Sequence, residues 1–170
     1  MLAAGAAAQA RVLGNRHDVA SFLSTVRAAM LHSLRVEALS GTVLSTAQAL
    51  IDYLGLDLAH APVERFRVFF LNAQNRLLDE ATFDGTISEA PVYPREIMRR
   101  ALELGATALL VAHNHPSGDP TPSQCDVRVT GKIVDAGRAL GIVVHDHVII
   151  ARTGWRSLRM MGILPAAASA

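Results

Sequence analysis

The sequence predicts one α/β domain in which helices flank a mixed, twisted β-sheet. Two observations support this fold class. Segments with helical spacing of apolar residues alternate along the chain with short runs of β-branched, aromatic or other bulky apolar residues, a pattern typical of α/β folds. Only a tight turn separates the first two strand-like segments. These two strands must therefore run antiparallel, and the sheet cannot be purely parallel.

The predicted elements follow one another without a long linker or an internal repeat. In chain order they are helices at 19–34 and 45–55, strands at 65–71 and 77–83, a helix at 94–104, a strand at 106–112, a helix at 123–140, and strands at 142–150 and 154–158.

The helices are predicted from apolar residues three or four apart and from the residues at their ends. Ser45 and Gln48 form the pattern of a capping box at the start of the second helix, which we expect to end near Gly55. Pro94 stands at the first position of the third helix, and Gly105 follows its last turn as a C-terminal cap.

The strands are predicted from runs of bulky apolar side chains. Phe66, Val68 and Phe69 lie in the first strand, and the turn at 73–76 joins it to the second. The run at 106–112 is apolar throughout, so we expect this strand to be buried on both faces of the sheet.

Composition excludes several classes of function. The chain has 170 residues and a formal net charge of +1, which does not support the broad positive surface of a DNA-binding protein. The single cysteine, Cys125, excludes an intramolecular disulfide and a multi-thiolate zinc site and fits a reduced, cytoplasmic protein. It also excludes a zinc deaminase, whose chemistry needs a Pro-Cys-x-x-Cys pair. No apolar run approaches the roughly 18 residues of a spanning helix, so no membrane is expected as a partner.

The segment 113–126 carries the residues most suited to chemistry. His113 and His115 lie two apart at the end of a predicted strand, so both imidazoles should lie on one face. Asp126 is in the first turn of the next helix, and the loop between can fold it back toward them. Two imidazoles, one carboxylate and an open position for water form the ligand set of a catalytic zinc ion, which lowers the pKa of that water to about 7.

Simpler interpretations exist for each part of this pattern. Taken alone, Ser123-x-x-Asp126 is most simply a capping box that opens a helix, and an isolated His-x-His is a weak signal. The combination is more specific, because capping and ligand roles for the same helical turn are compatible. The helix start would also place its amide donors beside the metal ion.

The same segment resembles a known family. His113-x-His115, followed by seven residues, Ser123, two residues and Asp126, matches the JAMM metal-binding motif of JAB/MPN-type metallopeptidases. Three segments resemble more closely the bacterial RadC-like (UPF0758) branch: Pro94–Glu96, Ala112–Ser123 and Asp146-His147.

The resemblance covers most of the chain and implies a domain organisation. It extends over residues 44–164 and implies the JAB/MPN, cytidine-deaminase-like architecture for that span. We interpret residues 1–43 as an N-terminal tail and helix, a truncated remnant of the helix-hairpin-helix region that usually precedes the RadC-like domain. The Ala-rich ends, 1–8 and 165–170, are interpreted as disordered or fraying tails.

The resemblance also implies roles for five residues. His113, His115 and Asp126 would hold one zinc ion per chain. Glu64, directly before the first strand, would act as general acid and base, and Ser123 would donate a hydrogen bond to the oxyanion. The implied reaction is hydrolysis of a peptide or isopeptide bond in a protein or peptide substrate.

Other polar residues are weaker candidates for a role in the site. The alternatives to Glu64 as general acid and base are Glu80, Glu89 and Glu96. Glu80 lies in the second strand and could face the site, whereas Glu96 is more simply a partner of the helix dipole. His145 and His147 form a second His-x-His, for which a buried, hydrogen-bonded His147 near the site is the simpler interpretation. Further residues are interpreted as packing or surface side chains: Cys125, His17, His32, His60, Trp155, and Arg95, Arg99 and Arg100 on one solvated helix face.

A different class of function remains as the alternative. The chain could be a DNA-repair-associated or mobile-element accessory protein whose metal site is structural or vestigial. That hypothesis predicts salt-sensitive DNA binding that survives the substitutions Glu64→Gln and Asp126→Asn.

Overall fold

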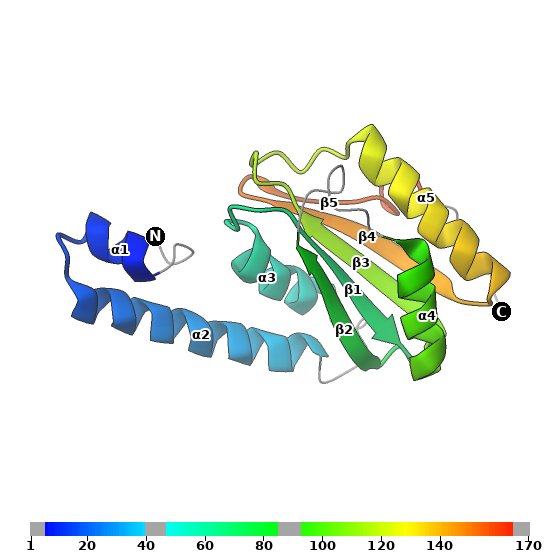
Figure 1. The fold of residues 1–170 in the computed structure, drawn as a ribbon, viewed down its shortest axis with the longest axis horizontal. Helices are drawn as coiled ribbons and strands as arrows, with labels where there is room; N and C mark the ends of the chain where they lie inside the picture. Colours follow the sequence, from blue (N-terminus) through cyan, green and yellow to red (C-terminus); the bar gives the residue numbers. More distant parts are fainter. Residues whose placement is uncertain (1–5, 40–46, 85–92, 165–170) are drawn as a thin grey trace.

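The computed structural model describes residues 6–39, 47–84 and 93–164 of the chain (Figure 1). Its elements, in chain order, are α1 (Ala6–Val12), α2 (His17–Leu39), α3 (Ala47–Leu58), β1 (Arg65–Leu71), β2 (Leu77–Asp84), α4 (Pro94–Leu104), β3 (Ala108–Asn114), α5 (Gln124–Ala139), β4 (Val143–Ala151) and β5 (Gly154–Ser157).

The five strands form one mixed sheet in the order β2-β1-β3-β4-β5. Strands β3 and β4 run parallel, and every other neighbouring pair is antiparallel. Helix α5 makes the crossover between the two parallel strands, because a parallel pair cannot be joined by a tight turn. The predicted mixed α/β fold is confirmed.

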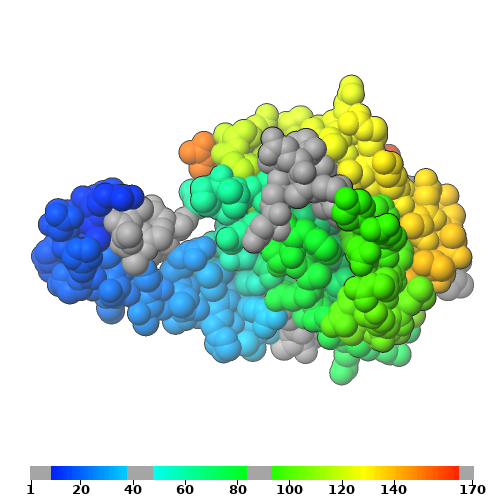
Figure 2. Space-filling model, viewed as in Figure 1, coloured from blue at the N-terminus to red at the C-terminus, as the bar shows by residue number. Residues whose placement is uncertain are grey.

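Helices cover both faces of the sheet (Figure 1). Alternate residues of β1 divide between two cores: Phe66, Val68 and Phe70 pack with α4 and α5, whereas Phe69 and Leu71 pack with α3. Every residue of β3 is buried, which confirms the prediction of a strand covered on both sides. Helix α2 packs against α3, and its N-terminal half extends beyond the sheet-containing body (Figure 2).

A buried arginine joins α3 to two strands on the face of the sheet that α3 covers. Arg67 of β1 forms ion pairs with Asp57 of α3 at 2.6 Å and with Glu80 of β2 at 2.9 Å, and it donates a hydrogen bond to the hydroxyl of Tyr53 at 3.0 Å. Removing one partner of such a buried set leaves the others unpaired, so the cluster holds these elements together.

The structure corrects several predicted boundaries. Helix α2 extends from His17 to Leu39, beyond both ends of the predicted helix at 19–34. Helix α3 continues through Gly55 to Leu58, because a glycine costs a helix only about 1 kcal/mol and the next turn is buried against the sheet. Residues 6–8 belong to α1 and not to a disordered tail, since alanine is the strongest helix former. Strand β3 begins two residues later than predicted, because the amide of Ala106 bonds to Ala101 O and completes the end of α4.

Two predictions at helix ends are confirmed, and others lie outside the described residues. Pro94 begins α4, and Gly105 caps it in the left-handed conformation with φ 65°. Ser123 is the N-cap of α5. The predicted capping box at Ser45 and the tails 1–5 and 165–170 lie outside the described residues.

Two glycines of α5 give opposite predictions for alanine substitution. A Cβ at Gly137 would lie 2.5 Å from the backbone oxygen of Ile142, whereas a Cβ at Gly131 would meet nothing within 4 Å. We expect Gly137→Ala to lower the free energy of unfolding by about 1–3 kcal/mol through overpacking. The matched Gly131→Ala should raise it by about 0.5–1 kcal/mol. Urea denaturation of both variants tests this, and equal effects of the same sign would contradict the close approach of α5 to the start of β4.

Candidate metal centre

The end of β3 brings two imidazoles together as predicted. His113 lies within the strand and is fully buried, and His115 lies just past its end. The amide of His115 bonds to Ile150 O at 2.9 Å, so the pairing with β4 continues beyond the last strand residue. The two side chains therefore share one face, with their Nε2 atoms 2.9 Å apart.

Asp126 reaches the same place from the first turn of α5. Its Oδ1 lies 3.3 Å from His113 Nε2, and its Oδ2 lies 3.3 Å from His115 Nε2. Ser123 and Asp126 also form the predicted capping box: the amide of Asp126 donates to Ser123 Oγ at 3.1 Å, and the amide of Ser123 donates to Asp126 Oδ2 at 2.6 Å. One carboxylate thus caps the helix and faces both imidazoles.

These three residues form a group that fits a divalent ion. One ligand atom from each of His113, His115 and Asp126 lies within 4.8 Å of the other two, and they are the only such group in the described part of the chain. The Nδ1 of His115 lies 2.8 Å from the carbonyl oxygen of Asp119. A carbonyl can only accept a hydrogen bond, so Nδ1 carries the proton and Nε2 points its lone pair at the centre. Imidazole nitrogen and carboxylate oxygen are the donors that zinc prefers.

The charges of the group are coupled. Burial raises the pKa of Asp126, but the adjacent imidazoles of His113 and His115, which favour the ionised carboxylate, outweigh burial and hold that pKa well below its ordinary value. The same contact with Asp126 raises the pKa of His115. Burial lowers the pKa of His147 behind the site, which keeps its imidazole neutral.

Glu64 stands beside the group, directly before β1. Its Oε1 lies 3.9 Å from His113 Nε2, and its side chain is 14% exposed. It lines an open pocket of about 460 Å³ together with His115, Pro116, Ser117, Ser123, Cys125 and Asp126. All five residues to which the resemblance assigns a role therefore lie around one site.

Asn114 is a residue whose role the sequence analysis missed. It is fully buried between the two histidines, and its side chain points to the opposite face of β3. Its Oδ1 accepts a hydrogen bond from the amide of Arg65 at 2.8 Å, and its Nδ2 donates to Val63 O at 3.1 Å. Asn114 thus holds the backbone on both sides of Glu64. An amide side chain between two candidate ligands was the only available signal.

The rival glutamates lie elsewhere. Glu80 faces α3 and pairs with Arg67 and Arg35, so the expectation that it could face the site was wrong. Glu96 is partly exposed and pairs with Arg99. Glu89 lies outside the described residues.

The second His-x-His does not form a second metal group. His145 Nε2 bonds to Asn75 Oδ1 at 2.7 Å, whereas His147 Nε2 lies 2.7 Å from His113 Nδ1. The register of β4 against β3 shifts at this point, which breaks the alternation that would have placed both rings on one face. The buried, hydrogen-bonded His147 near the site is confirmed.

The arginines of α4 are neutralised by acidic neighbours. Arg99 pairs with Glu96 and Glu103, and Arg100 pairs with Asp79 at 2.5 Å. These contacts confirm the interpretation of a solvated helix face. Cys125 is partly buried and packs against the core beneath α4 and α5.

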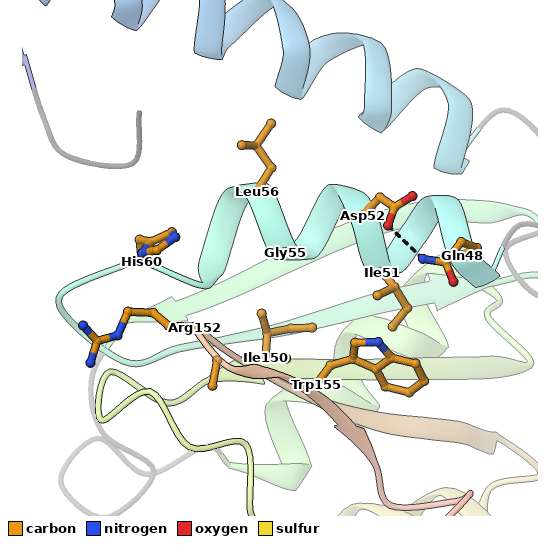
Figure 3. A pocket seen from close by; sticks show the side chains of 11 residues that line it. Gln48, Ile51, Asp52, Gly55, Leu56, His60, Ile150, Arg152 and Trp155 are labelled. Carbon is orange, nitrogen blue, oxygen red and sulfur yellow. Dashed lines mark hydrogen bonds between the residues drawn. The ribbon is translucent and has the colours of Figure 1, made fainter. Parts of the chain in front are cut away.

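A second pocket lies on the other side of the sheet, between α3 and the β4–β5 turn (Figure 3). It measures about 440 Å³ and shares no lining residue with the pocket at Glu64. Trp155 and Ile51 form its apolar floor, Asp52 is bonded to Gln48, and His60 lies at its rim.

Comparison with protein families matches residues 44–163 to the RadC-like JAB domain. The chain belongs to this family. A UPF0758 protein of Rhodobacter capsulatus is 47% identical to this RadC-like chain over 165 residues, which cover 96% of the chain and 77% of the relative. A UPF0758 protein of Ruegeria pomeroyi is 44% identical over 156 residues, which cover 91% of the chain and 70% of that relative.

None of the helices in the described part of this RadC-like chain has the length and apolar character needed to cross a membrane.

The affinity of this three-residue group for a divalent metal ion should fall as the pH falls, and zinc serves as the probe. The pKa of His115 is raised above its ordinary value of 6.5, so below that raised pKa a proton occupies the nitrogen that a metal ion needs. We expect the zinc dissociation constant to rise by up to about tenfold for each pH unit below the pKa of His115. Zinc titrations against a competing chelator across neutral pH measure this. An affinity that does not change with pH would contradict a ligand role for His115.

Proposed function

We propose that this RadC-like domain is a zinc-dependent peptidase that hydrolyses a peptide or isopeptide bond of a protein substrate. One observation carries the proposal: two imidazole nitrogens and a carboxylate converge beside an open pocket that His115, Asp126 and Glu64 line. The carboxylate of Glu64 lies 3.9 Å from His113 Nε2. The single cysteine supports a reduced, cytoplasmic setting for this activity.

His113, His115 and Asp126 would hold the ion. A zinc ion in such a site polarises the scissile carbonyl and lowers the pKa of water. The three side chains come from a strand end and from a helix that is capped by the same carboxylate. Rigid elements of this kind hold ligands in a fixed geometry, which supports a site built for one ion.

Glu64 would move the proton. Its Oε1 takes the proton of the attacking water and returns it to the nitrogen of the leaving amine, as a general base and then a general acid. Its place at the pocket wall, 3.9 Å from His113 Nε2, is within reach of a water molecule at the candidate ligands. Asn114 would keep Glu64 in this place by holding Val63 and Arg65.

Ser123 would stabilise the oxyanion. Its Oγ accepts the amide hydrogen of Asp126, so the hydroxyl can donate its own hydrogen to the developing negative charge. The pocket beside it, of about 460 Å³, would admit an extended polypeptide segment around the scissile bond.

Replacing Glu64 should separate catalysis from metal binding. We expect Glu64→Gln to keep its zinc content but to lose proteolytic activity by a factor of about 10²–10⁴, the usual contribution of a general base. Zinc is measured in the purified protein. Activity is measured as cleavage products in a proteome exposed to wild-type or variant enzyme: new protein N-termini for a peptide bond, and newly freed lysine side chains for an isopeptide bond. Glu96→Gln is the matched control, because Glu96 is a partly exposed carboxylate of α4 that does not line the pocket at Glu64.

The same experiment can reject the proposal. Purified protein that does not take up zinc on reconstitution would contradict it, as would cleavage products of either kind that persist unchanged in Glu64→Gln. Salt-sensitive DNA binding that survives both Glu64→Gln and Asp126→Asn would instead favour the DNA-associated alternative.

A further inference from the structure

A chain of buried hydrogen bonds runs behind the candidate metal ligands and joins two of them. His113 Nδ1 lies 2.7 Å from His147 Nε2, and His147 Nδ1 lies 2.6 Å from Thr130 Oγ1. Thr130 Oγ1 lies 2.6 Å from the backbone oxygen of Asp126, one turn earlier in α5. The chain therefore passes from β3 to β4 to α5 and ends on the residue that supplies the carboxylate.

The acceptor at the end of this chain determines the direction of every hydrogen bond in it. The carbonyl oxygen of Asp126 can only accept, so the hydroxyl of Thr130 donates to it. Thr130 Oγ1 must then accept from His147, which places the proton of His147 on Nδ1. A neutral His147 therefore offers a lone pair at Nε2, and His113 donates to it from Nδ1. The remaining nitrogen of His113, Nε2, is left with its lone pair facing His115 and Asp126.

Burial and packing hold this arrangement. His113, His147 and Thr130 are each at most 1% exposed, so a charged His147 would lack solvation in this environment. Phe66 stacks on His113 with an interplanar angle of 24° and meets His147 edge-on at 75°. The two imidazoles and the phenylalanine thus pack together in one buried cluster, in which the hydrogen-bond partners of each imidazole determine its tautomer.

We propose that His147 and Thr130 are positioning residues that fix the metal-binding tautomer of His113 and tie it to the backbone of Asp126. This inference rests on the proposed metal site and adds two residues to which the JAMM resemblance assigned no role. A partner that accepts the second ring proton of a ligand histidine typically changes metal affinity by about 10–100-fold. Here the partner is another imidazole, whose own tautomer a helix hydroxyl determines.

The sharpest variant removes one oxygen. Thr130→Val keeps the shape of the side chain but takes away the hydroxyl, so His147 Nδ1 loses its acceptor and the other tautomer of His147 becomes available. We expect zinc affinity, measured by chelator competition at fixed pH, to fall by about 10–100-fold. Thr130→Ser is the matched control, because it restores the hydroxyl, and its affinity should stay close to that of the wild type.

A second measurement tests the proton positions directly. Nitrogen-15 spectra of the histidine rings of the full chain report which nitrogen carries the hydrogen. In the wild type we expect hydrogen on Nδ1 of both His113 and His147, and in Thr130→Val we expect a mixture of tautomers at both rings. This readout needs no substrate, and the wild-type spectrum alone is decisive if Thr130→Val does not fold.

The outcomes separate this inference from the proposed function. Wild-type protein that binds zinc while Thr130→Val binds it equally well would overturn the positioning role and leave the metal site standing. Hydrogen on Nε2 of His113 in the zinc-free wild type would overturn it as well. A third outcome is wild-type protein that does not bind zinc but carries hydrogen on Nδ1 of both His113 and His147, with that hydrogen lost from Nδ1 in Thr130→Val. This outcome would support the chain of hydrogen bonds and contradict the proposed peptidase.

Discussion

The carboxylate of Asp126 is the group on which the geometry of the site depends. It accepts a hydrogen bond from the amide of Ser123 at the start of α5. It also lies 3.3 Å from His113 Nε2 and 3.3 Å from His115 Nε2. A helix start attracts negative charge because of its unpaired amides and its dipole. Both the helix start and the two imidazoles therefore stabilise the ionised carboxylate of Asp126 in this position. Together they outweigh burial, which disfavours the charged form. Without this carboxylate, the capping box of α5 would lose one of its two hydrogen bonds, and the imidazoles would lose their acidic partner.

Sheet topology explains why these groups meet at all. Strands β3 and β4 are parallel neighbours in the centre of the sheet, so their carboxyl ends lie at one edge, and the crossover after β3 must begin there. Helix α5 is that crossover, and its first turn is carried back to the strand end by the loop 115–123. His147 lies on β4 beside β3 and closes the rear of the site. The antiparallel neighbour β1 brings in Glu64 from the other side.

Local rules predicted what depends on near neighbours in the sequence. Strand alternation predicted the pairing of His113 with His115, and the Ser-x-x-Asp spacing predicted the cap of α5. Such rules could not predict side-chain contacts between residues of different elements, because tertiary packing determines them. The direction of Glu80 is set by Arg67, a residue of another strand, and helix α3 continues through Gly55 because its burial against the sheet offsets the cost of one glycine. The hydrogen bond between His147 and Thr130 joins residues that lie 17 positions apart on different elements. The periodicity of apolar residues along the sequence cannot predict such a contact.

Strand β3 positions Glu64 as well as the candidate ligands, because it is buried on both faces. A strand covered on both faces can point alternate side chains into two different environments. His113 points into the site, while Asn114 points the opposite way and grips the backbone on either side of Glu64. One strand thus fixes both the candidate ligands and the candidate proton carrier, although Glu64 lies about fifty residues earlier in the chain. The distance between Glu64 and the candidate metal ligands is therefore a property of the sheet register between β1 and β3. A slip of one residue would move both histidines to the wrong face.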